Sequence, residues 1–535
     1  MNAMHLARRP LPALAFAARI GTGAARTAAV ALAAAVLGFA TAAPRAALAS
    51  GPEHPDKLTY PALHFAPPEA GQYRVKLGNG VPVYLVPDHT LPLVNVTVLM
   101  RVGPDLDPQG KEGLASTTVH LLTRSGTKTL TAEQLEERLS FLGAQLESGL
   151  GGGGGMMGLG GLPLSGAETR VTLNLLAKDI DEGLGLLADC LKECAFQDDR
   201  LALRKDQQLS VMKRRNDESA TIEEMNWGFL MRGEDHWSNR YPTEASMKSI
   251  DKEDLVAFQR RWMGPKNFVI AASGDFDKNE MKKKLDKTFA NWPVSGENPG
   301  PPAAPKAAAA QGWFVADKDV NQTRVSLGLR TLDRYDPDFY TSQVMNYILG
   351  GGGFTSRLVN RIRSDEGLAY TVRSSFEGGF YYPDPWRAFF QTKARSTAFA
   401  LQIAGTEISR MRDSLVTASE LQTAKASFME GFPSRFPNAQ AIAGGLAVEE
   451  LTGRYAKDPK FFVQFTSRFE KIGAQDVQRV ARRLLDLEKM AVLMVGNAKE
   501  LMVSDGKHPV TVEQLAGGQP KRIPLRDPLT MQPLP

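Results

Sequence analysis

The sequence predicts an α+β protein built from two related halves. Residues 249–275 (SIDKEDLVAFQRRWMGPKNFVIAASGD) align without gaps over residues 471–497 (KIGAQDVQRVARRLLDLEKMAVLMVGN), with five identical positions. Both copies have the pattern of an amphipathic helix with an Arg-Arg pair, a turn, and an apolar strand that ends in glycine. An ungapped match of this kind favours a duplicated domain.

Within each half, strands are expected to flank helices. Residues 73–86 predict a hairpin that turns at Gly78-Asn79-Gly80, and an apolar strand follows over residues 94–102. Helices are expected from residue 113 and over residues 132–142. We therefore expect each half to place helices on one side of a largely antiparallel sheet.

Proline and alanine dominate residues 298–312, as in an exposed, semi-rigid linker between the halves. The tail that follows the second half is expected to be extended across the surface. The predicted divisions are a signal peptide (1–49), an N-terminal extension (50–72), a first domain (73–293), the linker (294–312), a second domain (313–503) and a C-terminal tail (504–535).

The first 49 residues have the pattern of a secretory signal peptide. Four arginines precede an apolar run over residues 28–43, and Ala47-Leu48-Ala49 offers a small-residue cleavage site. The run is short for a membrane span, so cleavage is favoured over an uncleaved anchor. We expect a secreted, periplasmic protein without a stable membrane anchor.

Charge argues against a nucleic-acid partner once the leader is removed. The leader holds five of the 64 basic residues, and the remaining 59 equal the 59 acidic residues. A mature chain with this balance has no broad attraction to nucleic acid or to anionic membrane.

The two cysteines and a glycine-rich segment do not indicate catalytic or binding sites. Cys190 and Cys194 are the only cysteines, and their spacing inside an expected helix favours core packing over a disulfide or a metal site. Residues 148–166 are rich in glycine, which fits a mobile loop at a cleft or a disordered expansion. Because no Gly-Lys-Ser/Thr closes the run, it does not predict a phosphate-binding loop.

Residues 113–127 (GLASTTVHLLTRSGT) resemble the helix that carries the inverted zinc motif, H-x-x-E-H, of the M16 (pitrilysin, or insulinase-like) peptidase family. In that motif, two histidines on one helix face bind zinc and the glutamate activates water. The matching positions here are Ser116, Val119 and His120. Serine is a poor zinc ligand and valine cannot take a proton, so the sequence predicts no zinc on this chain.

A third ligand of active members, a glutamate from a later helix, matches Ser210 or Val211 in the segment LSVMKRRNDE. His120 is then left alone, and a structural role is expected for it. The alternative is an autonomous zinc peptidase with relocated ligands around His120. His236 lies where the family often has a histidine in a loop, and we assign it no catalytic role.

Residues 349–370 (LGGGGFTSRLVNRIRSDEGLAY) resemble the second-domain motif of the shorter M16 peptidases. The resemblance implies that Arg363 and Tyr370 hold the substrate backbone, a task suited to a guanidinium fork and a phenolic hydroxyl. Alternatively, Arg363 pairs with Asp365 or Glu366 at the surface and Tyr370 belongs to the core. Glycines 350–353 are expected to allow a tight connection between helices.

The resemblance extends over both halves and implies two M16-type domains that form a clam shell around a chamber. A first half without zinc ligands beside a second half with the Arg/Tyr motif indicates a substrate-positioning subunit. Its expected partners are a zinc-bearing M16 subunit and a peptide substrate, with no cofactor on this chain. The alternative from another class is a non-enzymatic scaffold with the same fold.

Overall fold

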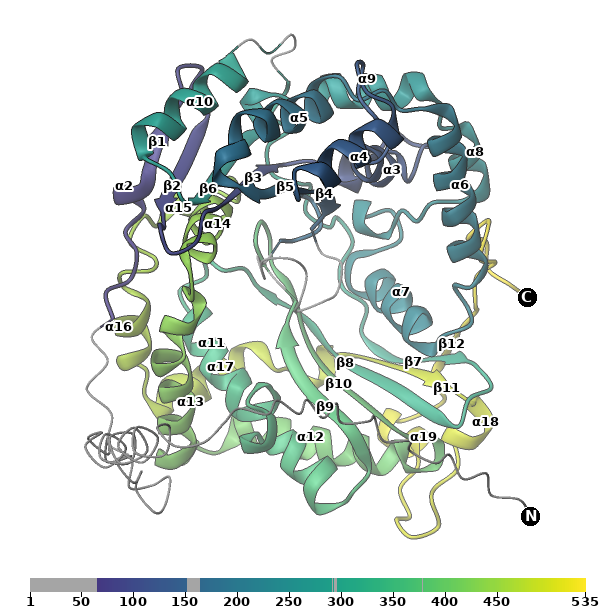
Figure 1. Ribbon diagram of the computed structural model, residues 1–535. Coiled ribbons are helices and arrows are strands. Elements are labelled where there is room, and N and C mark those ends of the chain that lie inside the picture. The colour runs from purple at the N-terminus through teal and green to yellow at the C-terminus, as the bar shows by residue number, and fades with distance from the viewer. Residues whose placement is uncertain (1–64, 152–163, 291, 293–295, 378) are drawn as a thin grey trace, which may run out of the picture. The chain divides into compact units, whose positions relative to one another are not determined.

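The computed structural model describes residues 65–151, 164–290, 292, 296–377 and 379–535. The expected signal peptide, most of the N-terminal extension and residues 152–163 of the glycine-rich segment lie outside the described residues. Residues 66–535 form one unit, which contains two six-stranded mixed sheets covered by helices (Figure 1). The predicted α+β class and the duplicated architecture are confirmed.

The first sheet has the strand order β1-β2-β6-β3-β5-β4. The β2–β6 pair is parallel and the other pairs are antiparallel. The predicted hairpin is present, with Arg74 opposite Tyr84. The strands are β1 (Arg74–Lys76), β2 (Pro82–Pro87), β3 (Leu93–Met100), β4 (Gln145–Leu150), β5 (Thr169–Leu176) and β6 (Phe268–Gly274).

The second sheet repeats this plan in the order β12-β7-β11-β8-β10-β9. Its first strand comes from the C-terminal tail and runs parallel to β7, so the tail completes the edge of the sheet. The strands are β7 (Gly312–Asp317), β8 (Gln322–Leu332), β9 (Ala369–Phe376), β10 (Asp384–Lys393), β11 (Ala491–Gly496) and β12 (Lys521–Ile523).

Helices precede and follow these strands in both halves. Several begin at side-chain caps, as where Thr131 accepts from the backbone N–H of Gln134. The first half contains α2 (Ala70–Tyr73), α3 (Leu114–Leu121), α4 (Ala132–Phe141), α5 (Ile180–Lys192), α6 (Asp198–Lys213), α7 (Ser219–Arg232), α8 (Glu244–Ser249), α9 (Lys252–Trp262) and α10 (Lys278–Ala290).

The second half contains α11 (Phe339–Asn346), α12 (Thr397–Asp413), α13 (Ala418–Glu430), α14 (Ala439–Leu451), α15 (Arg454–Lys457), α16 (Phe465–Glu470), α17 (Ala474–Leu484), α18 (Ala498–Leu501) and α19 (Val512–Ala516). Two π-helical segments, η6 (Tyr347–Gly351) and η8 (Val359–Asp365), lead into β9. No helix in the described ranges is long and apolar enough to cross a bilayer.

The duplicated segments form the same elements in both halves. Helix α9 and strand β6 in the first half correspond to α17 and β11 in the second, as the ungapped alignment predicts. Helices α7 and α14 also occupy equivalent places in the chain, because each is the third α-helix after a strand pair of its half, β4–β5 for α7 and β9–β10 for α14. The duplication therefore covers more than the aligned segments.

One helix is exchanged between the halves, which the sequence did not indicate. Helix α14 packs against the first sheet, where Leu446 and Ala447 join Tyr84 and Leu99 in one buried cluster. Helix α7 packs against the second sheet, where Trp227 lies in a cluster with Phe314, Leu493 and other residues (Figure 1). Each half thus covers apolar surface of the other, so the two depend on each other for stability.

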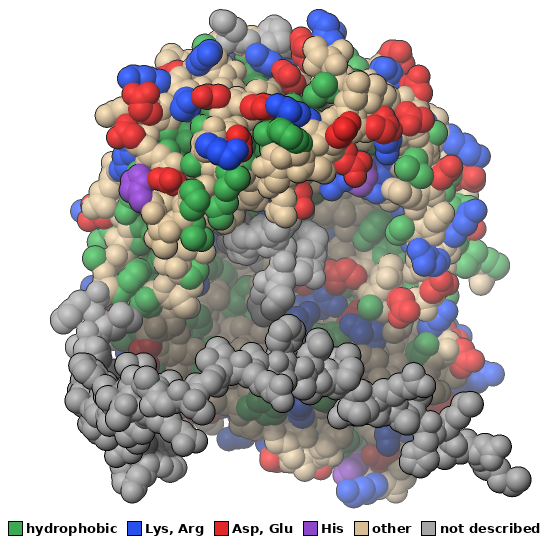
Figure 2. Space-filling view, viewed as in Figure 1, with side chains coloured by type: hydrophobic (Ala, Val, Ile, Leu, Met, Phe, Trp, Pro, Cys, Tyr) green, Lys and Arg blue, Asp and Glu red, His purple; other side chains and the backbone are tan. Residues whose placement is uncertain are grey.

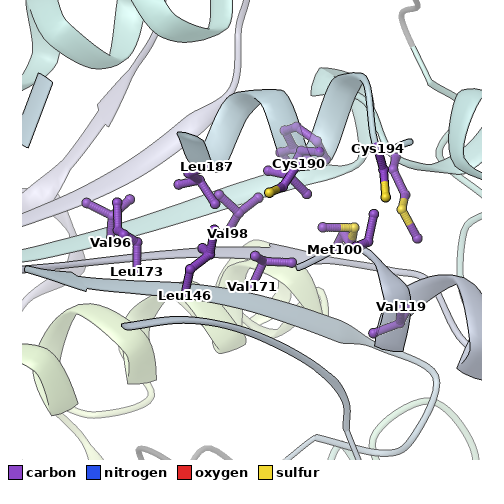
Figure 3. Packing of buried hydrophobic residues seen from close by; sticks show 14 of the residues in the cluster. Val96, Val98, Met100, Val119, Leu146, Val171, Leu173, Leu187, Cys190 and Cys194 are labelled. Carbon is purple, nitrogen blue, oxygen red and sulfur yellow. The ribbon is translucent and has the colours of Figure 1, made fainter. Parts of the chain in front are cut away.

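The largest buried cluster fills the first half between its sheet and helices α3, α5, α9 and α10. Cys190 and Cys194 are free and buried in it, close to Met100 (Figure 3). Burial raises the pKa of both thiols, that of Cys194 to about 11. The prediction of core packing for the two cysteines is confirmed.

Candidate functional site

Helix α3 holds the positions of the lost zinc motif, and a buried carboxylate fixes its first turn. Gly113 begins the helix at φ 102°, where a Cβ atom would lie 2.9 Å from Met247 Sδ. The Asp107 carboxylate accepts hydrogen bonds from the N–H groups of Gly113 and Ala115, at 2.8 and 2.6 Å. Burial raises the pKa of Asp107 to about 7, although these hydrogen bonds act in the opposite direction.

The side chains at the first two motif positions are engaged elsewhere. Ser116 Oγ donates to the carbonyl of Gly113 at 3.0 Å, one turn back on its own helix. Val119 is 1% exposed and packs in the first-half core (Figure 3). At the third ligand position, Ser210 and Val211 lie on the exposed surface of α6. These residues do not fit a zinc ion.

His120 lies half-buried beside two cations. Burial is the largest cause that lowers its pKa to about 4, and the guanidinium groups of Arg204 and Arg124 lower it further. A divalent cation at this place would meet the same repulsion. In the part of the chain that the structure describes, no group of three or more His, Cys, Asp or Glu side chains could hold a metal ion.

The His120 environment predicts acid sensitivity. Its folded-state pKa of about 4 lies below the ordinary 6.5, so the unfolded chain takes up the proton first as the pH falls. The stability contribution of neutral His120 is therefore complete above pH 6.5 and is lost between about 6.5 and 4. Because the ring is partly solvated, we expect this loss to be about 1–2 kcal/mol.

Urea denaturation at pH 7 and pH 4.5 measures this effect. The wild-type protein is expected to lose about 1–2 kcal/mol more than His120→Gln between the two pH values. Equal losses in the two proteins would show that His120 does not titrate in this way.

The second motif is held close to strand β9 by glycine. A Cβ atom on Gly350 would lie 2.5 Å from Ser374 Oγ and 2.9 Å from Ser374 N, so only glycine lets η6 approach the strand this closely. Asn346, at the end of α11, also reaches β9: its Nδ2 donates to the Ser374 carbonyl and its Oδ1 accepts from Ser374 Oγ. The motif therefore rests on a fixed support.

Arg363 lies close to two exposed aromatic rings. Its guanidinium carbon lies 4.6 Å from the centre of the Phe354 ring and 4.5 Å from that of Tyr370. Phe354 is 64% exposed and Tyr370 is 81% exposed, so Tyr370 is not a core residue. Asp365 pairs with Arg361 at 2.6 Å, and Arg363 has no ion pair with any described residue.

A β-bulge directs Tyr370 toward the solvent-facing side of the second sheet. Ala369 pairs with Thr392 and Val372 with Phe390, so Tyr370 and Thr371 together oppose one residue of β10. Ala369 and Val372 are buried, whereas the two bulge residues are exposed. The bulge therefore places Tyr370 on the same face as Arg373, which follows three residues later.

This face of the second sheet borders a cavity of about 810 Å³ next to α7. Among its lining residues are Arg324, Arg373, Arg387, Glu223 and Glu377, from α7 and from strands β8, β9 and β10 or the residue just after β9. Acidic and basic side chains also lie together in the hollowed part of the visible surface (Figure 2). The sequence analysis did not find this charged cavity, because its residues come from segments far apart in the chain.

Glu223 is at the centre of an ion-pair network that joins α7 to the second sheet. Its carboxylate is 1% exposed; Oε2 accepts from Arg324 Nε at 2.6 Å, and Oε1 lies 3.0 Å from an Arg387 nitrogen. Ser326 Oγ also donates to Glu223. These contacts satisfy the carboxylate and bind the exchanged helix to its sheet.

A second ion-pair set lies beside the first. Arg232 contacts Asp384 at 2.7 Å and Glu377 at 3.1 Å, and Trp227 Nε1 donates to Glu377 at 2.8 Å. Burial raises the pKa values of Glu377 and Asp384, whereas the Arg232 guanidinium lowers them. The cavity wall is thus charged but firmly cross-linked.

Comparison with known proteins finds similarity to M16 peptidases and their homologues. Residues 249–428 match the family model described as the peptidase M16 inactive domain. A Rickettsia bellii protein named an uncharacterized zinc protease is 22% identical over 421 residues, which cover 76% of this chain and 94% of that protein. These matches show that the chain is similar to M16 proteins. The resemblance found in the two motifs is confirmed.

Other M16 proteins match over most of their own length. A Helicobacter pylori protein named non-peptidase homolog YmxG is 24% identical and covers 66% of this chain and 78% of that protein. The solved structure of a peptidase M16 inactive domain from Pseudomonas fluorescens superposes with a TM-score of 0.67 at 21% identity, over 82% of this chain and 99% of that one. This structural likeness establishes the M16 fold.

His236 lies among structural contacts. Its Nδ1 lies 2.8 Å from Ser238 Oγ and its Nε2 lies 3.2 Å from the Ala303 carbonyl, so the ring ties the linker to the first half. Burial lowers its pKa to about 4. The assignment of no catalytic role to His236 stays a prediction.

Proposed function

We propose that this chain is a non-catalytic, substrate-positioning subunit of a peptidase whose zinc is carried by a separate M16 subunit. The proposal rests on the pair formed by Arg363 and Tyr370. The Arg363 guanidinium lies against the Tyr370 ring, Tyr370 is exposed, and Arg363 has no ion-pair partner among the described residues. The zinc-motif positions of α3, in contrast, are occupied by packing and by a helix-internal hydrogen bond.

Arg363 and Tyr370 suit the binding of an extended peptide. A guanidinium that packs against two rings loses part of its freedom to move, and its N–H donors can bind peptide carbonyls or a carboxylate. The Tyr370 hydroxyl can donate to an oxygen that gains negative charge during hydrolysis in the partner's site. The inactive-domain match and the name of the Helicobacter pylori relative support a subunit without its own catalysis.

The proposed location is the periplasm, or more broadly outside the cytoplasm. Support comes from the leader pattern in the first 49 residues, with its arginines, apolar run and small-residue cleavage site. The substrates would be peptides that enter the chamber between this chain and the zinc-bearing subunit.

The test is peptidase activity and zinc content of the mature protein, alone and mixed with a zinc-bearing M16 subunit from the same source. We expect activity only in the mixture. Arg363→Ala should lower kcat/KM of the mixture by about 100-fold, as the loss of one transition-state donor typically does. The matched control is Arg361→Ala, which removes an exposed arginine that pairs with Asp365 nearby.

Two results would reject this function. Stoichiometric zinc and activity in the chain alone would establish an autonomous peptidase. A stable complex whose activity is unchanged by Arg363→Ala would establish a scaffold.

A further inference from the structure

We propose that the cavity between α7 and the second sheet is a subsite for a peptide carboxylate, with Arg373 as the residue that determines specificity. The inference deepens the proposed function and rests on it, because it names the class of peptide that the positioning subunit prefers. It depends on the position of Arg373, on the pairing of its charged neighbours and on the chemistry of the cavity wall.

Arg373 lies on the same strand face as the motif. It lies three positions after Tyr370, which corresponds to about 10 Å along a strand. The bulge places both side chains on the exposed face, and Arg373 lies opposite Phe389 in the register of β9 and β10. An extended peptide held at Tyr370 would therefore bring a side chain two or three residues away, or its own terminus, to Arg373.

The arginines of the cavity differ in their partners. Arg324 and Arg387 are paired with the buried Glu223 carboxylate, and Arg232 is paired with the largely buried Asp384. Arg373 and Arg215 also line the cavity, but neither has an acidic partner among the described residues. Arg215 donates instead to the carbonyls of Pro528 and Pro242.

Two cations that lack an acidic partner in the described part of the chain, within one cavity, favour an anionic ligand. A guanidinium fork forms charge-assisted hydrogen bonds with a carboxylate, and these bonds are strongest where water is partly excluded. Burial lowers the pKa of Arg215, and an incoming carboxylate would oppose that effect.

The surrounding wall fits a carboxylate on an organic chain. The guanidinium carbons of Arg324 and Arg373 lie 4.7 and 5.7 Å from the centre of the Phe389 ring, so an apolar platform lies between the cations. Ser375 adds a hydroxyl to the lining. Glu223 and Glu224 line the same cavity and would repel a dianion such as phosphate more strongly than a singly charged carboxylate.

The carboxylate could belong to an acidic side chain of the peptide or to the peptide's C-terminus. Measuring how peptides bind to this protein alone, purified without a partner, distinguishes the two sources. Fluorescence anisotropy would compare labelled peptides of one sequence: central glutamate with an amidated C-terminus, central glutamine amidated, central lysine amidated, and central glutamine with a free C-terminus. We expect a carboxylate-bearing peptide to bind about tenfold more tightly than the neutral amidated peptide. If the amidated glutamate peptide binds most tightly, the subsite takes an acidic side chain. If the peptide with the free C-terminus binds most tightly, the subsite takes the chain terminus.

Arg373→Gln should abolish this preference. The matched control is Arg395→Gln, because Arg395 is an exposed arginine that pairs with Glu500 and does not line the cavity. Equal binding of the neutral and carboxylate peptides, a preference for lysine, or a preference that survives Arg373→Gln would overturn the inference.

The assay uses no peptidase, so its failure is distinguishable from failure of the proposed function. Activity in the mixture without a carboxylate preference would reject the subsite alone. A carboxylate preference in a chain that supports no peptidase would reject the positioning function and leave the cavity as a binding site.

Discussion

Replacing Glu223 with alanine is expected to lower the free energy of unfolding by about 3–5 kcal/mol. Glu223 is 1% exposed, and it is the carboxylate that Arg324 and Arg387 share with Ser326. Its removal leaves Arg324 without a described acidic partner inside a partly buried wall. Breaking a buried ion pair from one side costs more than the pair contributes, because the remaining charge stays desolvated.

Glu224 provides the matched control on the next position of the same helix. Its side chain is 69% exposed and contacts Arg387 at 2.8 Å, so Glu224→Ala should cost less than about 1 kcal/mol. Urea denaturation followed by tryptophan fluorescence would report both changes, since Trp227 lies on α7 beside the network. Similar small losses for both variants would mean that the ion pairs of Glu223 contribute little to holding α7 on its sheet.

Much of the fold could be predicted from local patterns. The duplicated segment predicted α9 with β6 and α17 with β11, because each copy carries a helical and then a strand-like periodicity. The glycine turn likewise predicted the β1–β2 hairpin. In these cases the decisive interactions lie within a few residues of one another.

The exchange of α7 and α14 could not be predicted in this way. An amphipathic helix shows that it has an apolar face but not which sheet covers it. Trp227 meets Leu493, and Glu223 meets Arg324, across long stretches of chain. Such pairings are decided by tertiary packing, and a single sequence contains no direct record of them.

The sequence pointed to candidate site residues, whose roles stay predictions, but not to their geometry. The substitutions at Ser116 and Val119 predicted the loss of zinc ligands, and the packing of Val119 gives the physical reason that a carboxylate is excluded there. The contact of Arg363 with Phe354, in contrast, depends on how η6 and η8 turn before β9. The bulge at Tyr370 depends on the register with β10, which no local pattern encodes.

Asn346→Leu is expected to destabilise the protein by about 2–5 kcal/mol and to weaken peptide binding as well. Asn346 Oδ1 accepts from Trp386 Nε1 at 2.8 Å and from Ser374 Oγ at 2.7 Å, and Nδ2 donates to the Ser374 carbonyl at 3.2 Å. Leucine has a similar volume but leaves these buried groups without partners. The cost then comes from unsatisfied polar atoms and not from a cavity.

The effect on binding would follow from the position of Ser374 in β9. This strand carries Tyr370 and Arg373 on its exposed face, whereas Asn346 is buried and holds the strand from the other side. A double-mutant cycle with Trp386→Phe tests the argument, because removing the indole N–H should make Asn346→Leu less costly. Additive losses would show that the amide does not act through Trp386, and unchanged peptide binding would show that β9 keeps its position without Asn346.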